Sequence, residues 1–98
     1  MFDSERLSHA IEQVHKQQEH RRAWQEGDDG EKIANMLLTE AQELKDAVVE
    51  SMLTGDVFSV ASEIGDILYL SLRFCQEVGL DPADVLDLKT KKKKKKYD

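Results

Sequence analysis

Apolar residues recur along most of this 98-residue chain at the three- and four-residue spacing of an amphipathic helix. The spacing predicts a first helix over residues 4 to about 24, with Ser4 as its N-cap, and a second over residues 31 to about 53. A turn sequence, Gly-Asp-Asp-Gly at 27–30, separates the two. On the second helix a carboxylate, Glu40, stands on the apolar line at a position that should face a core.

A third helix, which Asp56 can cap, is predicted to run to about residue 78. From Ile64 onward it is apolar nearly all round, and a helix of this kind is buried on most sides. A monomer of this size cannot easily bury it, so the sequence predicts an oligomer. After Asp81, Pro82 suits the first position of a last short helix that ends at about residue 88.

These elements predict an all-α fold, a helical bundle of three main helices plus a short C-terminal helix, completed by oligomerisation. We expect one helical domain over 1–88 and a flexible, lysine-rich tail over 89–98. The domain carries 7 basic and 19 acidic residues, a net charge of −12. A body this acidic repels nucleic acids and anionic membranes, and a divalent cation is one source of counter-charge.

Several protein classes are excluded by what the sequence lacks. Cys75 is the single cysteine, which excludes an internal disulfide and a cysteine-based zinc site. No apolar run reaches the ~18 residues of a membrane span, and the first residues lack the order of a secretory signal. We therefore expect a cytoplasmic protein. His9, His15 and His20 are expected on solvated helix faces, without the companion ligands of a metal site.

Four acidic residues form two pairs with three-residue spacing, Glu40 with Glu43 and Glu63 with Asp66. This spacing places each pair on one side of its helix, and two antiparallel helices can bring the pairs together. Carboxylates so gathered must be protonated, paired or bound to cations, and oxygen ligands favour Mg²⁺ or Mn²⁺ over Zn²⁺. Gly65, beside Asp66, indicates close approach by another group. Ordinary solvated acids stay the alternative, since such pairs arise easily in an acidic chain.

The chain resembles the MazG-like all-α nucleotide pyrophosphohydrolases over about residues 30–88. The resemblance is carried by Lys32-Ile33, Glu40-Ala41-Gln42-Glu43-Leu44, Glu63-Ile64-Gly65-Asp66-Ile67-Leu68-Tyr69 and Gly79-Leu80-Asp81. It implies a site in which Glu40, Glu43, Glu63 and Asp66 bind Mg²⁺ and one carboxylate left free acts as general base. It also implies hydrolysis of nucleoside triphosphates between the α and β phosphates to monophosphate and pyrophosphate, a house-cleaning role, and a homodimer or homotetramer.

Candidates for substrate binding are one aromatic and three basic side chains. Trp24 could stack on a base, or could simply anchor the end of the first helix. Lys32 lies near the acids on the second helix. Lys89 and Lys93 could contact phosphate, although the family often has asparagine at the position of Lys93, and a solvated lysine tail is the alternative.

Two rival functions stay open. Phosphoribosyl-ATP pyrophosphohydrolase shares the fold and the paired acids, but it typically has a histidine after a tyrosine where this chain has Tyr69-Leu70. The rival from another class is a non-catalytic helical interaction module, whose acidic seam would pair with basic residues of a partner or of its own tail.

Overall fold

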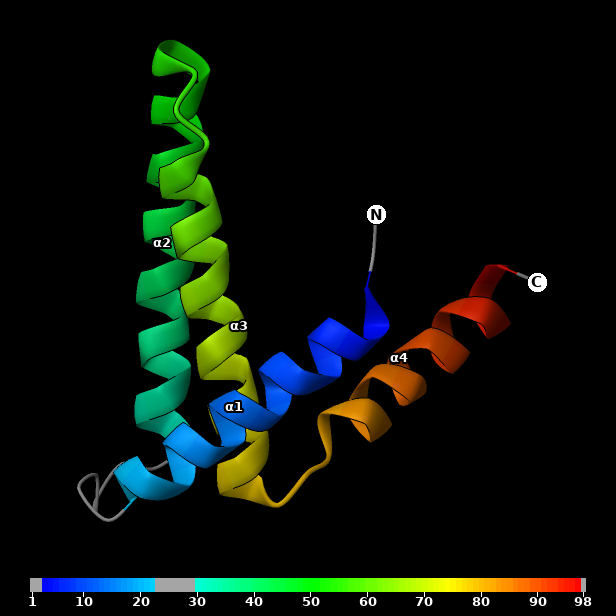
Figure 1. Cartoon of the computed structure of the whole chain (residues 1–98). Coiled ribbons are helices and arrows are strands. Elements are labelled where there is room, and N and C mark those ends of the chain that lie inside the picture. Colours follow the sequence, from blue (N-terminus) through cyan, green and yellow to red (C-terminus); the bar gives the residue numbers. More distant parts are fainter. Residues whose placement is uncertain (1–2, 23–29, 98) are drawn as a thin grey trace.

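The computed structural model describes the backbone of residues 3–22 and 30–97, and the side chains of residues 3–17 and 30–91. It contains four helices, and within these ranges there is no strand (Figure 1). The bounds are α1 Ser4–Arg22, α2 Gly30–Thr54, α3 Phe58–Val78 and α4 Pro82–Tyr97. The predicted all-α fold is confirmed.

Helices α2 and α3 form a long antiparallel hairpin, which holds most of the tertiary packing of the described chain (Figure 1). Its fully buried side chain is Ile33 near the start of α2, and Ala47 and Leu70 are buried farther along. At the tip, Gly55 has a φ of 76°, which favours glycine. Asp56 then accepts hydrogen bonds from Phe58 N at 2.9 Å and Ser59 Oγ at 3.1 Å, so its carboxylate serves the start of α3, although the N-cap position itself is Val57, one residue after the predicted cap.

The remaining helix ends follow local capping chemistry. Asp3 caps α1, since its Oδ1 accepts from Arg6 N at 3.0 Å, so the predicted cap at Ser4 is wrong by one residue. Gly79, with a φ of 74°, ends α3, and Leu80 N donates to the Cys75 carbonyl at 2.8 Å. Asp81 Oδ1 accepts a hydrogen bond from Ala83 N at 2.8 Å and so caps the start of α4.

Helix α4 is longer than the sequence pattern indicated. It continues to Tyr97, so the predicted end near residue 88 is wrong. No glycine or proline interrupts residues 83–97, and lysine is a good helix former where the side chain points to water. In Figure 1, α4 leads away from the hairpin, while α1 crosses α3 at the end of the hairpin opposite its tip. Flexibility of the lysine-rich tail stays a prediction.

Helix α3 is not buried on most sides within one chain. Its buried residues are Leu70 and Arg73, whereas Leu68 is 60% exposed and Ile64 and Val78 are also exposed. The oligomer that the sequence predicts would cover this apolar surface, and oligomerisation stays a prediction. None of the described helices has the length and apolarity needed to cross a membrane.

Candidate metal centre

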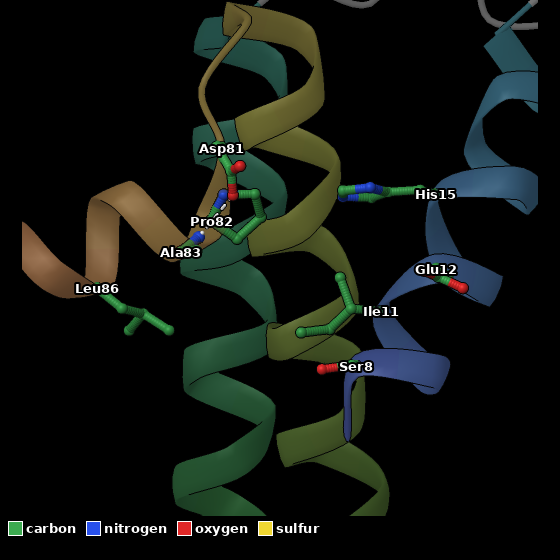
Figure 2. A pocket seen from close by; sticks show the side chains of 8 residues that line it. All are labelled: Ser8, Ile11, Glu12, His15, Asp81, Pro82, Ala83 and Leu86. Carbon is green, nitrogen blue, oxygen red and sulfur yellow. Dashed lines mark hydrogen bonds between the residues drawn. The ribbon is translucent and has the colours of Figure 1, made fainter. Parts of the chain in front are cut away.

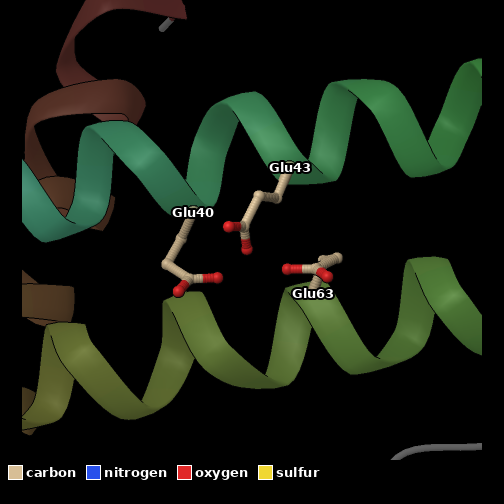
Figure 3. Close-up of side chains that lie close together, drawn as sticks. All are labelled: Glu40, Glu43 and Glu63. Carbon is tan, nitrogen blue, oxygen red and sulfur yellow. The ribbon is translucent and has the colours of Figure 1, made fainter.

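Three of the four predicted acids meet across the α2–α3 interface. Glu40 and Glu43 extend from α2 and Glu63 extends from α3 into the space between the two helices (Figure 3). One carboxylate oxygen from each residue lies within 4.8 Å of the other two. The antiparallel hairpin therefore brings Glu63 close to two residues that lie 20 and 23 positions before it in the sequence.

The positions of Glu40 and Glu63 explain why they meet. Glu40 stands on the same stripe of α2 as the half-buried Leu37 and Leu44, and this stripe packs against α3. On α3, Glu63 occupies the equivalent stripe that also carries Leu70. The apolar packing that forms the hairpin thus holds two carboxylates at positions where apolar residues would stabilise it more.

Burial leaves this carboxylate group poorly solvated. Glu40 and Glu63 are half-buried and Glu43 is exposed. One oxygen of Glu40 and one of Glu63, Oε2 in both, are inaccessible to water and have no hydrogen-bond partner in the described chain. The pKa of Glu40 is raised from 4.5 to about 7, and the largest cause is the loss of solvation on burial. Hydrogen bonding to Glu43 and repulsion by its charge raise it further, followed by hydrogen bonding to Glu63 and repulsion by the charge of Asp66.

The donor set fits a divalent cation. A buried carboxylate oxygen without a partner is unfavourable unless a proton, a hydrogen-bond donor or a metal satisfies it. Carboxylate oxygens are the ligands that Mg²⁺ and Mn²⁺ prefer, and a cation here would engage the oxygens that the protein leaves unsatisfied. The arrangement can therefore hold a cation and, through it, a phosphate chain.

Asp66, the fourth acid, stands apart from the other three. It is exposed on α3 and does not belong to the group within 4.8 Å, although its charge contributes to the raised pKa of Glu40. Beside it, Gly65 shows no close approach inside the chain, because no described atom lies within 4 Å of the place a Cβ would take. The close approach expected at this glycine is therefore absent within one copy.

Of the four predicted substrate-binding residues, the structure describes the side chains of two. Lys32 is exposed near the start of α2, about two turns before Glu40, and Lys89 is exposed on α4. Trp24 lies outside the described residues, and so does the side chain of Lys93. Their roles stay predictions.

Away from the carboxylates, a hollow of about 470 Å³ lies between one face of α1 and the start of α4 (Figure 2). There His15 is half-buried, and its Nε2 is inaccessible and has no hydrogen-bond partner among the described residues. The prediction of a solvated His15 is wrong, because it shares the inward face of α1 with Ile11, one turn earlier. The spacing of the two residues indicates that they share a face of α1, but not that this face points inward. The hollow is lined by Ser8, Ile11, Glu12, His15, Asp81, Pro82, Ala83 and Leu86.

The chain belongs to the class of MazG-like all-α pyrophosphohydrolases, as the sequence motifs indicated, and its four described helices and the carboxylates paired across the hairpin agree with that class. More specifically, the chain matches the profile of the phosphoribosyl-ATP pyrophosphohydrolase family across residues 5–93, and it belongs to that family. No curated protein and no solved structure matches it. The family match thus indicates a pyrophosphohydrolase that acts on anhydride bonds.

Proposed function

We propose that the protein is a Mg²⁺-dependent hydrolase, able also to use Mn²⁺, that cleaves a nucleoside triphosphate between its α and β phosphates. The products are a nucleoside monophosphate and pyrophosphate, and the role is removal of surplus or non-standard nucleotides. The observation that carries the proposal is the group Glu40, Glu43 and Glu63, with oxygens within 4.8 Å and two buried oxygens unsatisfied. Family membership supplies the type of reaction.

Each acid has a role that follows from its place. Glu40 and Glu63, which have the unsatisfied oxygens, hold the cation, and Glu43 and Asp66 complete its surroundings. The bound cation supplies charge neutralisation on the phosphate oxygens and lowers the pKa of bound water. Glu43 is the exposed member of the group, so water reaches its carboxylate, which accepts a proton from the attacking water.

Two substrates are compatible with this reaction, and both contain the same triphosphate. The family match favours phosphoribosyl-ATP. The sequence after Tyr69, where Leu70 replaces the expected histidine, favours an ordinary or modified nucleoside triphosphate. Leu70 is buried in the hairpin, so it is a core residue in this chain.

Product analysis tests the proposal. The purified protein is incubated with Mg²⁺ and a panel of nucleoside triphosphates that includes phosphoribosyl-ATP, and products are separated by chromatography. Monophosphate plus pyrophosphate is expected, with loss of turnover in Glu43→Gln and Asp66→Asn. The control is Glu50→Gln, an exposed acid on α2 outside the group, which should keep full turnover. Diphosphate plus phosphate would show that the scissile bond is a different one.

The rival function, a non-catalytic helical interaction module, predicts a different response to metal. A cation that binds only the folded protein raises its stability by about 2.7 kcal/mol at a hundredfold excess over the dissociation constant. Thermal unfolding with and without Mg²⁺ measures this directly. An unchanged midpoint, together with no turnover on the panel, would favour the interaction module.

A further inference from the structure

The last turns of α4 carry half of the basic residues of the chain. Seven of the fourteen lysines and arginines lie between Lys89 and Lys96, and the remaining residue of this stretch is Thr90. We call residues 89–96 the lysine segment. The structure has this segment inside one continuous helix, α4, so its charges are held along one axis.

The helix makes the charge of the lysine segment dense and regular. An α-helix rises ~1.5 Å per residue, so the segment is ~10.5 Å long and carries one positive charge per ~1.5 Å. Double-stranded DNA carries one negative charge per ~1.7 Å of its axis, whereas one strand alone carries one per ~3.4 Å. The lysine segment therefore matches the charge spacing of a duplex and exceeds that of a single strand about twofold.

The lysines repel one another unless anions lie among them. Residues three and four apart are neighbours on a helix, and like charges at these spacings destabilise it. Lys89 and Lys91, whose side chains are described, are both exposed, and no ion pair joins either of them to another described residue. The described acids of the chain therefore leave the start of the segment without a counter-charge.

The lysine segment also lies away from the acidic part of the chain. In Figure 1, α4 leads away from the hairpin, and it packs only slightly on the other helices. Lys91 lies ~13.5 Å along the helix axis from Pro82, where α4 begins. This distance exceeds the Debye length of ~8 Å at physiological salt, so negative charge near the start of α4 is largely screened at most of the segment.

We propose that the lysine segment binds the phosphate backbone of a double-stranded nucleic acid without recognising its base sequence. Lysines all round one helix pair with phosphates whatever the bases are, and contacts to phosphate carry no sequence information. Helix α4 as a whole is cationic, with seven lysines against two acids, Asp84 and Asp87. The net charge of −12 over residues 1–88 orients the rest of the chain away from the duplex.

An anionic membrane suits the lysine segment less well. Polybasic segments attract anionic lipids, but stable attachment takes a second anchor, such as an apolar helix face or an acyl chain. After Leu88, the one residue of α4 with an apolar body is Tyr97. The lysines would therefore have to hold the chain on a membrane by charge alone, so the duplex is the better partner.

Fluorescence anisotropy of the full chain with short labelled duplexes of mixed sequence, one of DNA and one of RNA, tests the proposal. Binding is expected at ~50 mM salt, and a plot of log affinity against log salt should have a slope of about −3 to −6, as three to seven phosphate contacts require. Equal binding to both duplexes supports recognition of the shared backbone, and binding to one alone supports the proposal for that duplex. Tighter binding to a single strand of the same length would refute the preference for a duplex.

Two double variants of equal net charge locate the contact. Lys91→Gln with Lys95→Gln removes two charges from the lysine segment, and glutamine is a good helix former. The affinity should fall about tenfold at ~100 mM salt, and the slope should become shallower by about 1–2. The matched control is Lys16→Gln with Lys45→Gln, which removes two exposed lysines from α1 and α2 and should leave the slope unchanged.

Circular dichroism checks that both double variants keep the helical content of the parent chain. Three results would overturn the proposal: no binding of the parent to either duplex, equal effects of the two double variants, or binding to vesicles of anionic lipid but not to the duplexes.

Discussion

The proton on Glu40 should make metal binding depend on pH in a defined way. The pKa of Glu40 in the metal-free protein is about 7 because the carboxyl is half-buried and lies close to Glu43 and Glu63, with a further contribution from the charge of Asp66. A cation binds the deprotonated carboxylate, so binding must release that proton. The mean number of protons released per bound cation is about 0.9 at pH 6, about 0.5 at pH 7 and about 0.1 at pH 8. Apparent Mg²⁺ affinity should therefore fall about tenfold from pH 8 to pH 6.

Isothermal titration calorimetry measures both quantities. Titrating Mg²⁺ at several pH values gives the affinity, and repeating the titration in buffers of different ionisation enthalpy counts the protons. Glu40→Gln is the control, because it should bind more weakly but lose the pH dependence between pH 6 and 8. Carboxylates with ordinary pKa values near 4.5 would give an affinity that changes by only a few per cent in this range. A flat profile in the parent chain would therefore refute the assignment of Glu40 as a ligand with a raised pKa.

Three further predictions concern the stability of the fold. Because folding raises the pKa of Glu40, ionisation of this carboxyl destabilises the metal-free protein increasingly as pH rises from about 4.5 through 7. Glu40→Gln should therefore raise the unfolding temperature at pH 8 and leave it nearly unchanged at pH 4. Ile33→Ala should lose about 2–5 kcal/mol in urea unfolding, because Ile33 is fully buried, whereas Leu38→Ala at an exposed site should lose under about 0.5 kcal/mol; equal losses would contradict the assigned core. Gly79→Ala should lose about 1–2 kcal/mol because of the left-handed φ, with a smaller loss for Gly79→Asn; the reverse order would contradict the capping argument.

Helix periodicity and capping residues were sufficient to predict most of the fold. The hairpin of α2 and α3, its break at Gly55 and the end of α3 at Gly79 follow from local sequence, since positive-φ glycines stop helices whatever surrounds them. The proximity of Glu40 and Glu63 was predictable from helix periodicity. Each lies on the apolar stripe of its helix, and two stripes that pack bring everything on them together.

Other features depend on information that the local pattern does not contain. A run of lysines is compatible with a solvated coil or a solvated helix, because lysine propensity favours helix while neighbouring charges repel, and only the structure shows α4 continuing to Tyr97. The burial of His15 depends on how α1 crosses the rest of the chain, which is a tertiary property. The separation of Asp66 from the other three acids depends on side-chain direction on α3, which residue spacing fixes only to within a turn.

The acids of the candidate site bear on the predicted oligomerisation, because two of them stand in the main interface of the chain. The face of α3 toward α2 holds Glu63 where an apolar side chain would contribute more to the hairpin, and Glu40 does the same from α2. The hairpin core is correspondingly small, with Ile33 its one fully buried large side chain among the described residues. A chain that places acids in its main interface needs apolar burial elsewhere to stay folded. The predicted oligomer would supply it, because α3 leaves Ile64 and Leu68 exposed and a second copy could bury such side chains.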